Sequence, residues 1–566
     1  MISFSSRSRA QRLVAVLCML ALTLVPILPK AAWATSESEH AAATGILTVS
    51  SSVADAYEAY QLFDAKVVDG DGSGGKLATS VAWTSDAVRE AVLPVLHEAG
   101  MDTADAVAQD VAEWLDADGN MTPVLAMGLA RAIRTLGIEP EAISAGSSVN
   151  LPTGYWLVIA EEGAVGESQA GTAPIFTLIG GSPVTVEPKT AVPAVRKHVL
   201  EDSDGVWRKA ADATVGDDLY WRLCAMIPAG LVGYDAYPVE FADIMSAGLD
   251  PAKVATSARV YVAAGTDGSF DAVAAAGSSV GIEPVDGWRD ITAGSIVAVD
   301  AAANTFTVRT GDLIAALGGA EKFATGARVV VVYNAPLGTS ANRGAEKGNP
   351  NEVFLRYPRS PFADQGGEGG YTRTPSDDAT AYTWDLTLTK RASEDQVPLS
   401  GAVLRITDDR GRQLAADGTW VGGDAAVTTG ADGRVTVSGV DSGTLTVEEV
   451  AAPEGYIGLT GARALTLSIE GLDVQQVAAA RPTLTVSAED PLFIDKVDAA
   501  SGTVEATIPN SQEPSGPGEW FEGLLSKTGD RCLIAISALA AAGATAGILL
   551  VVGSRLFRRE GDRRGK

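Results

Sequence analysis

Apolar residues along most of this chain alternate with polar ones or form short runs bounded by Gly, Asp and Pro, which is typical of β-strands. Strands are expected at 45–49, 57–68 and 154–159. Between the last two, apolar residues recur at the three- and four-residue spacing of amphipathic helices, over 85–99, 103–115 and 124–136. Helices inserted in a β framework predict an α+β domain over 35–188.

The rest of the chain predicts β domains without long helices. Over 189–365 short strands are expected at 260–262, 295–299, 305–308, 329–333 and 352–355, with the spacing of a β-sandwich. The glycine-rich segment 366–381 is expected to be a linker, and 382–510 a further short-strand domain. Residues 511–524, rich in Ser, Pro and Gly, are expected to form an extended stalk. The fold class predicted is mainly β and multidomain, with Ig-like sandwiches in tandem.

The amino-terminal segment has the three parts of a secretory signal peptide. Arg7, Arg9 and Arg12 precede an apolar run from Leu13 to Leu28, and a small-residue site ends at Ala34. Residues 1–34 are therefore expected to be removed on export.

The carboxyl-terminal segment has an apolar run, 532–552, long enough to span a bilayer as a helix. The tail that follows, 553–566, is rich in Arg and is expected to stay in the cytoplasm, which leaves the upstream chain outside. Directly before this span stands the pentapeptide Leu525, Ser526, Lys527, Thr528, Gly529.

Charge and cysteine content limit the function further. The chain carries a net charge of −28, and removal of the two Arg-containing ends makes the remainder more acidic still. Such a surface argues against nucleic-acid binding. Only Cys224 remains between the processed ends, so no disulfide is expected within one mature chain. The three histidines are scattered, and neither a metal centre nor a cofactor site is expected.

The carboxyl-terminal pentapeptide, the span and the basic tail resemble the LPXTG wall-sorting signal of Gram-positive surface proteins. The resemblance implies that sortase cleaves between Thr528 and Gly529 and joins Thr528 to an amine. Ser526 stands where the family has Pro. Because Pro presets the local backbone, this change is expected to slow sorting or to require a particular sortase.

The three domains resemble those of Gram-positive sortase-assembled pilins. In the first two domains the resemblance rests on short motifs, at 57–63, 154–158, 237–243, 333–335 and 348–351. The third domain resembles a Cna B-type domain through 386–390, 398–402 and the segment 449–456.

The resemblance implies an isopeptide bond in the third domain, with Lys390 as nucleophile, Glu449 as acid and Asn510 as electrophile. Burial would favour the neutral amine that attacks, and a protonated carboxyl would polarise the amide. The alternative is that Lys390 is a solvated strand residue and Asn510 a turn residue. Glu448 alternates to the opposite strand face and is expected to be exposed.

The second domain has Lys197 and Asp243 where the family has its lysine and acid. The family's Asn before a Pro is replaced by Tyr357, which has no amide. No bond is therefore expected in this domain unless Asn334 or another residue substitutes.

A lysine shortly before Lys197 is expected to link one subunit to the next. Residues 184–189 resemble the pilin motif, which ends in a lysine that joins the next subunit, although Glu187 replaces its Tyr. Lys189 is thus the expected polymerisation lysine. Alternatively it is an ordinary linker lysine, and the protein is then a tip subunit or a monomeric adhesin.

The function expected is that of a structural pilus subunit that mediates adhesion and is not an enzyme. Its expected partners are sortase, other pilin subunits, peptidoglycan and a host surface ligand, and its expected location is the cell wall and fimbrium. One alternative is a non-polymerised, wall-anchored adhesin that binds a host ligand. The other, a secreted enzyme on a wall anchor, lacks a catalytic constellation beyond self-crosslinking.

Overall fold

The computed structural model describes residues 43–50, 53–70, 75–171, 173–188, 192–265, 287–362, 370–474, 476–477, 480 and 482–513. The predicted signal peptide, Lys189 and the sorting signal at 525–566 lie outside these ranges. Within them, no helix is long and apolar enough to cross a membrane. The chain divides into two compact units: one holds most residues up to Thr383 and the other most residues from Trp384.

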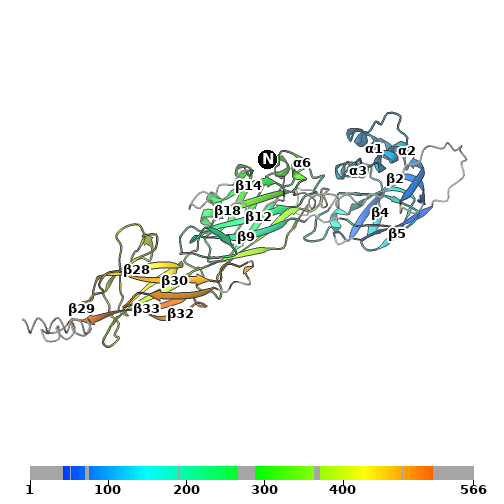
Figure 1. The fold of residues 1–566 in the computed structure, drawn as a ribbon. Helices are drawn as coiled ribbons and strands as arrows, with labels where there is room; N and C mark the ends of the chain where they lie inside the picture. Colours follow the sequence, from blue (N-terminus) through cyan, green and yellow to red (C-terminus); the bar gives the residue numbers. More distant parts are fainter. Residues whose placement is uncertain are drawn as a thin grey trace, which may run out of the picture. The chain divides into compact units, whose positions relative to one another are not determined.

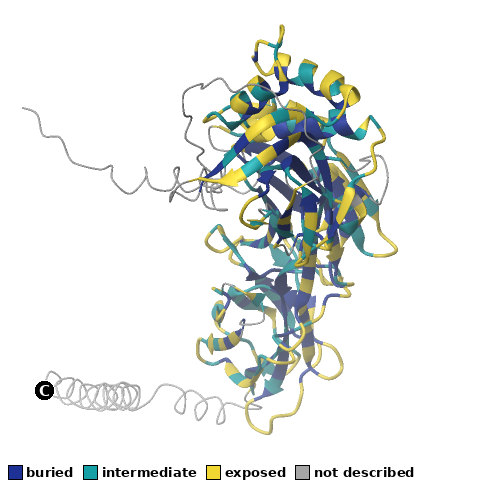
Figure 2. Ribbon diagram, turned by 90° about the vertical axis from the view of Figure 1, so that its right-hand side faces the viewer, coloured by how far each residue is buried: buried dark blue, intermediate teal, exposed yellow. Residues whose placement is uncertain are grey.

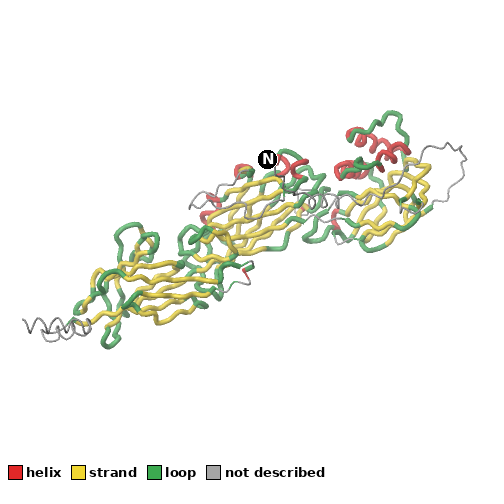
Figure 3. Tube along the Cα trace, in the orientation of Figure 1, coloured by secondary structure: helices red, strands yellow, loops and turns green. Residues whose placement is uncertain are grey.

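The first domain has two sheets and a helical layer (Figures 1 and 3). The smaller sheet has the order β5-β1-β8, made of Ser148–Pro152, Thr44–Val49 and Val184–Val186. The larger has the order β3-β2-β6-β7, made of Lys76–Trp83, Ala56–Asp69, Gly154–Ala160 and Ile175–Ile179, with β4 (Glu141–Ser144) beside β2. The helices are α1 (Asp86–Glu98), α2 (Ala108–Asp116) and α3 (Pro123–Arg134), and a short 3-10 turn, η1, covers Glu162–Ala164.

Strand β6 lies between two apolar layers, which explains its unbroken apolar sequence. Tyr155 and Leu157 belong to the core shared with the helices, whereas Trp156 and Val158 belong to the core shared with the smaller sheet. A strand buried on both faces needs apolar residues at every position. The predicted insertion of helices in a β framework is confirmed.

The second domain is a sandwich of two sheets. One has the order β10-β9-β12-β18-β14-β15, made of Val206–Arg208, Ala194–Glu201, Tyr220–Ile227, Ala327–Asn334, Arg259–Ala264 and Arg289–Asp290. The other has the order β11-β21-β19-β13-β17-β16, made of Ala210–Asp212, Asp377–Tyr382, Asn349–Pro358, Glu240–Met245, Thr305–Arg309 and Ile296–Asp300, with β20 (Tyr371–Arg373) beside β19. Short helical elements between strands are η2 (Pro251–Lys253), α4 (Val254–Ser257), η3 (Thr292–Gly294), α5 (Leu313–Leu317) and α6 (Ala320–Phe323).

The linker predicted at 366–381 is wrong for its described part. Strands β20 and β21 pair with β19, and β21 also pairs in parallel with β11, so these residues complete the second sandwich. The inward side chains of β21 are Ala379 and Ala381, both fully buried. Because these small residues stand between polar ones, the sequence of β21 has no strong apolar alternation that would predict a strand. The glycines before it therefore led to the prediction of a linker.

The first two domains contact each other through two reciprocal insertions. Ala170, from the loop before β7, is fully buried in the apolar core of the second domain. Phe362, which follows β19, packs against the core of the first domain, and the guanidinium of Arg134 lies 4.5 Å from its ring centroid. Arg131 on α3 donates to the carbonyl of Gly233 and pairs with Asp235 at 3.0 Å.

The third domain is a second two-sheet sandwich. One sheet has the order β27-β22-β33-β29, made of Arg434–Val440, Trp384–Ala392, Thr503–Gln512 and Tyr456–Ile457, with β32 (Phe493–Asp498) beside β33. The other has the order β25-β24-β23-β28-β30-β31, made of Trp420–Val421, Gln413–Leu414, Val403–Thr407, Gly443–Ala451, Arg463–Glu470 and Thr483–Ala488, with β26 (Val427–Thr428) beside β23.

Strands β22 and β33 are parallel neighbours although they begin and end the third domain. Buried and exposed residues alternate along many strands in all three domains, as Figure 2 shows. The predicted fold class, mainly β and multidomain with an α+β first domain, is confirmed.

Candidate cross-linking sites

Three strands of the third domain each carry a polar residue on the face that points into the sandwich, at even spacing from the apolar residues of that face. Lys390 follows Leu386 and Leu388 on β22, and Asn510 follows Ala506 and Ile508 on β33, all of them buried. On the opposite sheet, Glu449 continues the inward row of β28. The period-two alternation of side chains therefore directs all three polar groups into the sandwich.

The structure brings the three predicted groups into direct contact. The Nζ of Lys390 lies 2.8 Å from Oε2 of Glu449 and 2.6 Å from Oδ1 of Asn510. The Nδ2 of Asn510 donates to Oε1 of Glu449 at 2.9 Å. The side chains of Lys390 and Glu449 have no exposed surface. Lys390 is thus a buried residue at the centre of a triad and not a solvated strand residue.

The electrostatics of this site shift the lysine toward its uncharged form. Burial lowers the pKa of Lys390, against the opposing effect of the Glu449 carboxylate. The Oε2 of Glu449 also accepts a hydrogen bond of 2.6 Å from the backbone N–H of Leu459, which fixes the carboxyl group. A neutral amine next to an amide carbonyl can attack its carbon, and the adjacent carboxyl can transfer protons.

Glu448 points away from this site, as the alternation predicted. Its side chain is 43% exposed and pairs with Arg405 at 2.7 Å. Two adjacent glutamates on β28 thus have different surroundings, which makes them a matched pair for mutagenesis.

Among the polar groups that the same alternation directs into the second sandwich, four belong to one cluster. Lys197 lies between Val195 and Val199 on β9, and Asp243 between Phe241 and Met245 on β13. Tyr333 ends the inward row of β18, and Asn351 follows Asn349 in the inward row of β19 that continues to Tyr357. All four polar residues are almost fully buried.

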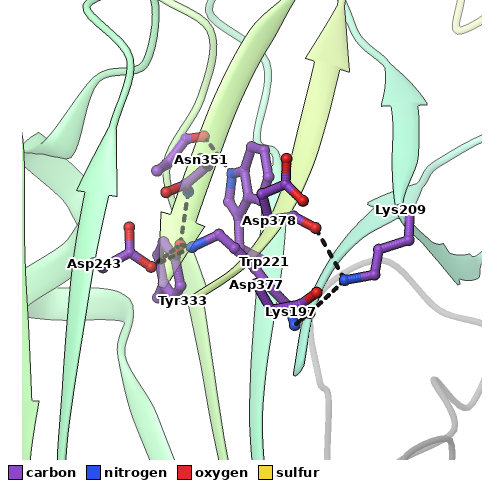
Figure 4. A network of polar contacts seen from close by, with 9 residues as sticks. Lys197, Lys209, Trp221, Asp243, Tyr333, Asn351, Asp377 and Asp378 are labelled. Atoms are coloured by element: carbon purple, nitrogen blue, oxygen red, sulfur yellow. Dashed lines mark hydrogen bonds and ion pairs between the residues drawn. The ribbon is translucent and has the colours of Figure 1, made fainter. Parts of the chain in front are cut away.

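These four residues form one network, which Figure 4 shows. The ammonium of Lys197 is paired with Oδ2 of Asp243. The hydroxyl of Tyr333 lies 2.9 Å from Nζ of Lys197, 3.1 Å from Oδ2 of Asp243 and 2.8 Å from Nδ2 of Asn351. Figure 4 also shows Lys209 paired with Asp377, which accepts the backbone N–H of Lys197 at 2.7 Å.

Burial shifts both titratable partners of this network toward their neutral forms. It lowers the pKa of Lys197 to about 8, although Asp243 opposes the shift. It raises the pKa of Asp243, against the opposing effects of Lys197 and Tyr333. An uncharged amine and a protonated carboxyl are the forms that amide-bond formation requires.

Asn351 is the functional candidate that the sequence interpretation missed. The family pattern has its amide at the end of β19, where Tyr357 instead donates to the carbonyl of Gln169 at 3.2 Å. Asn334 accepts a hydrogen bond from the backbone N–H of Leu219 at 3.3 Å and so holds the residue that precedes β12. The signal that could have identified Asn351 is its even spacing before Val353, Leu355 and Tyr357.

The expected polymerisation lysine cannot be placed, because Lys189 and the sorting motif lie outside the described residues. The described chain reaches Pro188 directly after β8, which pairs in parallel with β1.

The class of the third domain is supported by a family comparison. The model of the SpaA prealbumin-like fold domain matches residues 385–478. A search of curated proteins finds no match.

Solved structures of pilins also match this chain. The T6 backbone pilin of serotype M6 Streptococcus pyogenes is 16% identical, covering 84% of this chain and 100% of its own, with a TM-score of 0.46. The full-length major pilin SpaD from Corynebacterium diphtheriae is 14% identical, and the match covers 83% of this chain and 98% of SpaD, with a TM-score of 0.41. BcpA, the major pilin subunit of Bacillus cereus, is 12% identical, and the match covers 83% of this chain and 99% of BcpA, with a TM-score of 0.38.

Proposed function

We propose that this chain is a structural pilus subunit that stabilises itself by internal amide bonds. The observation that carries the proposal is the buried contact of Lys390 with both Glu449 and Asn510. An isolated buried lysine is unfavourable in a protein core, and a covalent bond to the adjacent amide removes its charge. The match of residues 385–478 to a prealbumin-like fold domain supports the same function.

The bond in the third domain forms by attack of the neutral Lys390 amine on Cγ of Asn510. The new Nζ–Cγ bond forms, the Cγ–Nδ2 bond breaks, and Nδ2 leaves as ammonia. The two oxygens of Glu449 lie near the two nitrogens. The Glu449 carboxyl receives a proton from Nζ and gives one to Nδ2, so the carboxyl is unchanged after the reaction.

We propose a second bond, between Lys197 and Asn351, with Asp243 as its acid. The buried network and the pKa shifts of Lys197 and Asp243 support it. This proposal replaces the expectation, drawn from the sequence alone, that the second domain has no amide for such a bond.

Mass spectrometry of the full chain tests both bonds. Each amide releases one ammonia and lowers the intact mass by about 17 Da. Asn510→Ala and Asn351→Ala should each abolish one of these losses, whereas Asn334→Ala, the control, should leave both. A wild-type chain of unreduced mass would contradict the proposal.

The proposal extends to assembly by sortase, anchoring to peptidoglycan and adhesion to a host surface. Sortase is expected to join Thr528 of one subunit to Lys189 of the next. Lys189→Ala should reduce the ladder of wall-released polymers to monomer and leave export intact, and Lys347→Ala serves as the control. An unchanged ladder would exclude Lys189, and a wild-type protein without a ladder would favour the monomeric adhesin.

A further inference from the structure

One hydroxyl group in the second domain lies between the lysine and the amide. The Oη of Tyr333 accepts hydrogen bonds from Nζ of Lys197 at 2.9 Å and from Nδ2 of Asn351 at 2.8 Å, and it donates to Oδ2 of Asp243 at 3.1 Å (Figure 4). A phenol has one proton to donate and two lone pairs, so its hydrogen-bonding capacity is filled.

The ring that carries this hydroxyl is held in place. Tyr333 is fully buried, and its ring meets that of Phe306 edge to face, with centroids 4.6 Å apart. A fixed ring keeps the hydroxyl in contact with both nitrogens without further loss of conformational freedom.

The two domains differ in which group touches the leaving nitrogen. In the third domain one carboxyl, that of Glu449, contacts both Lys390 Nζ and Asn510 Nδ2. In the second domain the described contact of Asn351 Nδ2 is with Tyr333, while Asp243 contacts Lys197 and Tyr333. Proton transfer between the two nitrogens of the second domain therefore has its shortest described route through the phenol.

We propose that Tyr333 is a catalytic residue of the second cross-link and relays a proton from the attacking to the leaving nitrogen. The Nζ of Lys197 bonds to Cγ of Asn351 and gives a proton to Oη. The proton that Oη first donates to Oδ2 of Asp243 turns toward Nδ2 by rotation of the hydroxyl and is transferred to it. The Cγ–Nδ2 bond then breaks and ammonia leaves. Tyr333 is regenerated, and no oxidant or other reactant is needed. This inference rests on the proposed bond between Lys197 and Asn351.

The relay leaves Asp243 to activate the amide oxygen. Asp243 lies opposite Val353 in the β13–β19 pair, so Asn351, two residues away on the same face, is its diagonal neighbour. The Oδ1 atoms of Asp243 and Asn351 are both buried without a hydrogen-bond partner. A proton on Oδ1 of Asp243 would satisfy both acceptors and polarise the carbonyl.

The rate of cross-linking in the full chain tests the relay. We suggest cell-free synthesis, with samples quenched over time, digested, and analysed by mass spectrometry for the two cross-linked peptides. Tyr333→Phe should slow formation of the Lys197–Asn351 peptide about a hundredfold or more, as expected for a lost proton-transfer group. The Lys390–Asn510 peptide, measured in the same samples, is the internal control and should be unaffected.

A stability comparison separates catalysis from folding. Lys197→Met and Lys197→Met/Tyr333→Phe cannot form the bond, so their unfolding transitions report the structural effect of the hydroxyl alone. If Tyr333→Phe does not fold, 3-fluorotyrosine at position 333 replaces it, because this residue keeps the shape and lowers the pKa of the phenol. A changed rate with 3-fluorotyrosine supports the relay.

The outcomes are distinguishable. A folded Tyr333→Phe chain that forms the second bond at the wild-type rate overturns the relay and leaves the proposed bond intact. An unchanged rate with 3-fluorotyrosine overturns it equally. A wild-type chain without the Lys197–Asn351 peptide contradicts the proposed bond, and the relay with it.

Discussion

At the scale of single residues, the two lysines that are fully buried among the described residues are informative, because each would destabilise an ordinary core. Lys197 and Lys390 have no exposed surface. An ammonium in such a position needs a partner, and removal of that partner leaves an uncompensated charge. Permanent conversion to an amide removes this cost, so variants that cannot react should also be less stable.

The adjacent glutamates of β28 provide the first prediction. Glu449→Gln should prevent loss of ammonia in the third domain, because the proton-transferring carboxyl is gone. Glu448→Gln, at the half-exposed neighbouring position, should cross-link as the wild type does. Intact mass measurements of the two variants show whether ammonia has been lost. Full cross-linking in Glu449→Gln would exclude Glu449 as the acid.

The second prediction concerns Glu201, which is buried in the second domain. Burial, and then the neighbouring Asp212, raise the pKa of Glu201 to about 7 from 4.5. Between these pH values the folded state holds more protons than the unfolded state, so stability falls as pH rises. Glu201→Gln should flatten this dependence, measured as the unfolding free energy from pH 4.5 to 7. An unchanged slope would contradict the shift.

At the scale of elements, alternation predicted much of the fold and of the third-domain site. The inward rows of β22, β28 and β33 include Lys390, Glu449 and Asn510, and the structure brings these three residues together. Their adjacency across two sheets does not follow from alternation alone. It depends on the parallel pairing of β22 with β33, which only the structure shows, whereas the resemblance to a known domain assigned the three residues to one bond.

The second-domain site was harder to predict because its amide lies at the start of β19 and not at its end. The register that sets Met245 opposite Asn351 brings this amide near Asp243. Pairing register depends on contacts between strands far apart in the sequence and cannot be derived from one strand's composition. The same reason applies to β21, whose polar and small residues form a strand only beside β11 and β19.

The third prediction concerns the packing of α1 on α3 in the first domain. A Cβ atom at Gly128 would lie 2.8 Å from Cγ1 of Val95, so the helices are close at this point. Gly128→Leu should destabilise the first domain by about 1–3 kcal/mol through overpacking. Gly163→Ala, where a Cβ meets nothing within 4 Å, is the control. Denaturation followed by helical circular dichroism should show the loss only for Gly128→Leu.

At the scale of the whole molecule, the first two domains form one compact unit because each contributes a residue to the other's packing. Ala170 lies in the second-domain core and Phe362 against the first-domain core. Interdomain contacts of this kind are expected to make the two domains unfold together.

The fourth prediction tests this coupling. Phe362→Ala should lower the melting temperature of the first domain and separate its calorimetric transition from that of the second. Phe354→Ala, which removes a half-buried ring that lies against Arg373 on the outer side of β19, should not separate them. Two transitions already present in the wild type would show that the domains are independent.

The parallel pairing of β22 with β33 has a consequence for a chain under tension. With the proposed amide in place, a pulling force passes from Lys390 directly to Asn510, and every residue between them lies on a closed side loop outside the load path. A break in that loop, or an insertion into it, changes neither the covalent continuity of the force-bearing chain nor its contour length. With this amide in place, a sequence change in the loops of the third domain leaves the covalent load path as it is.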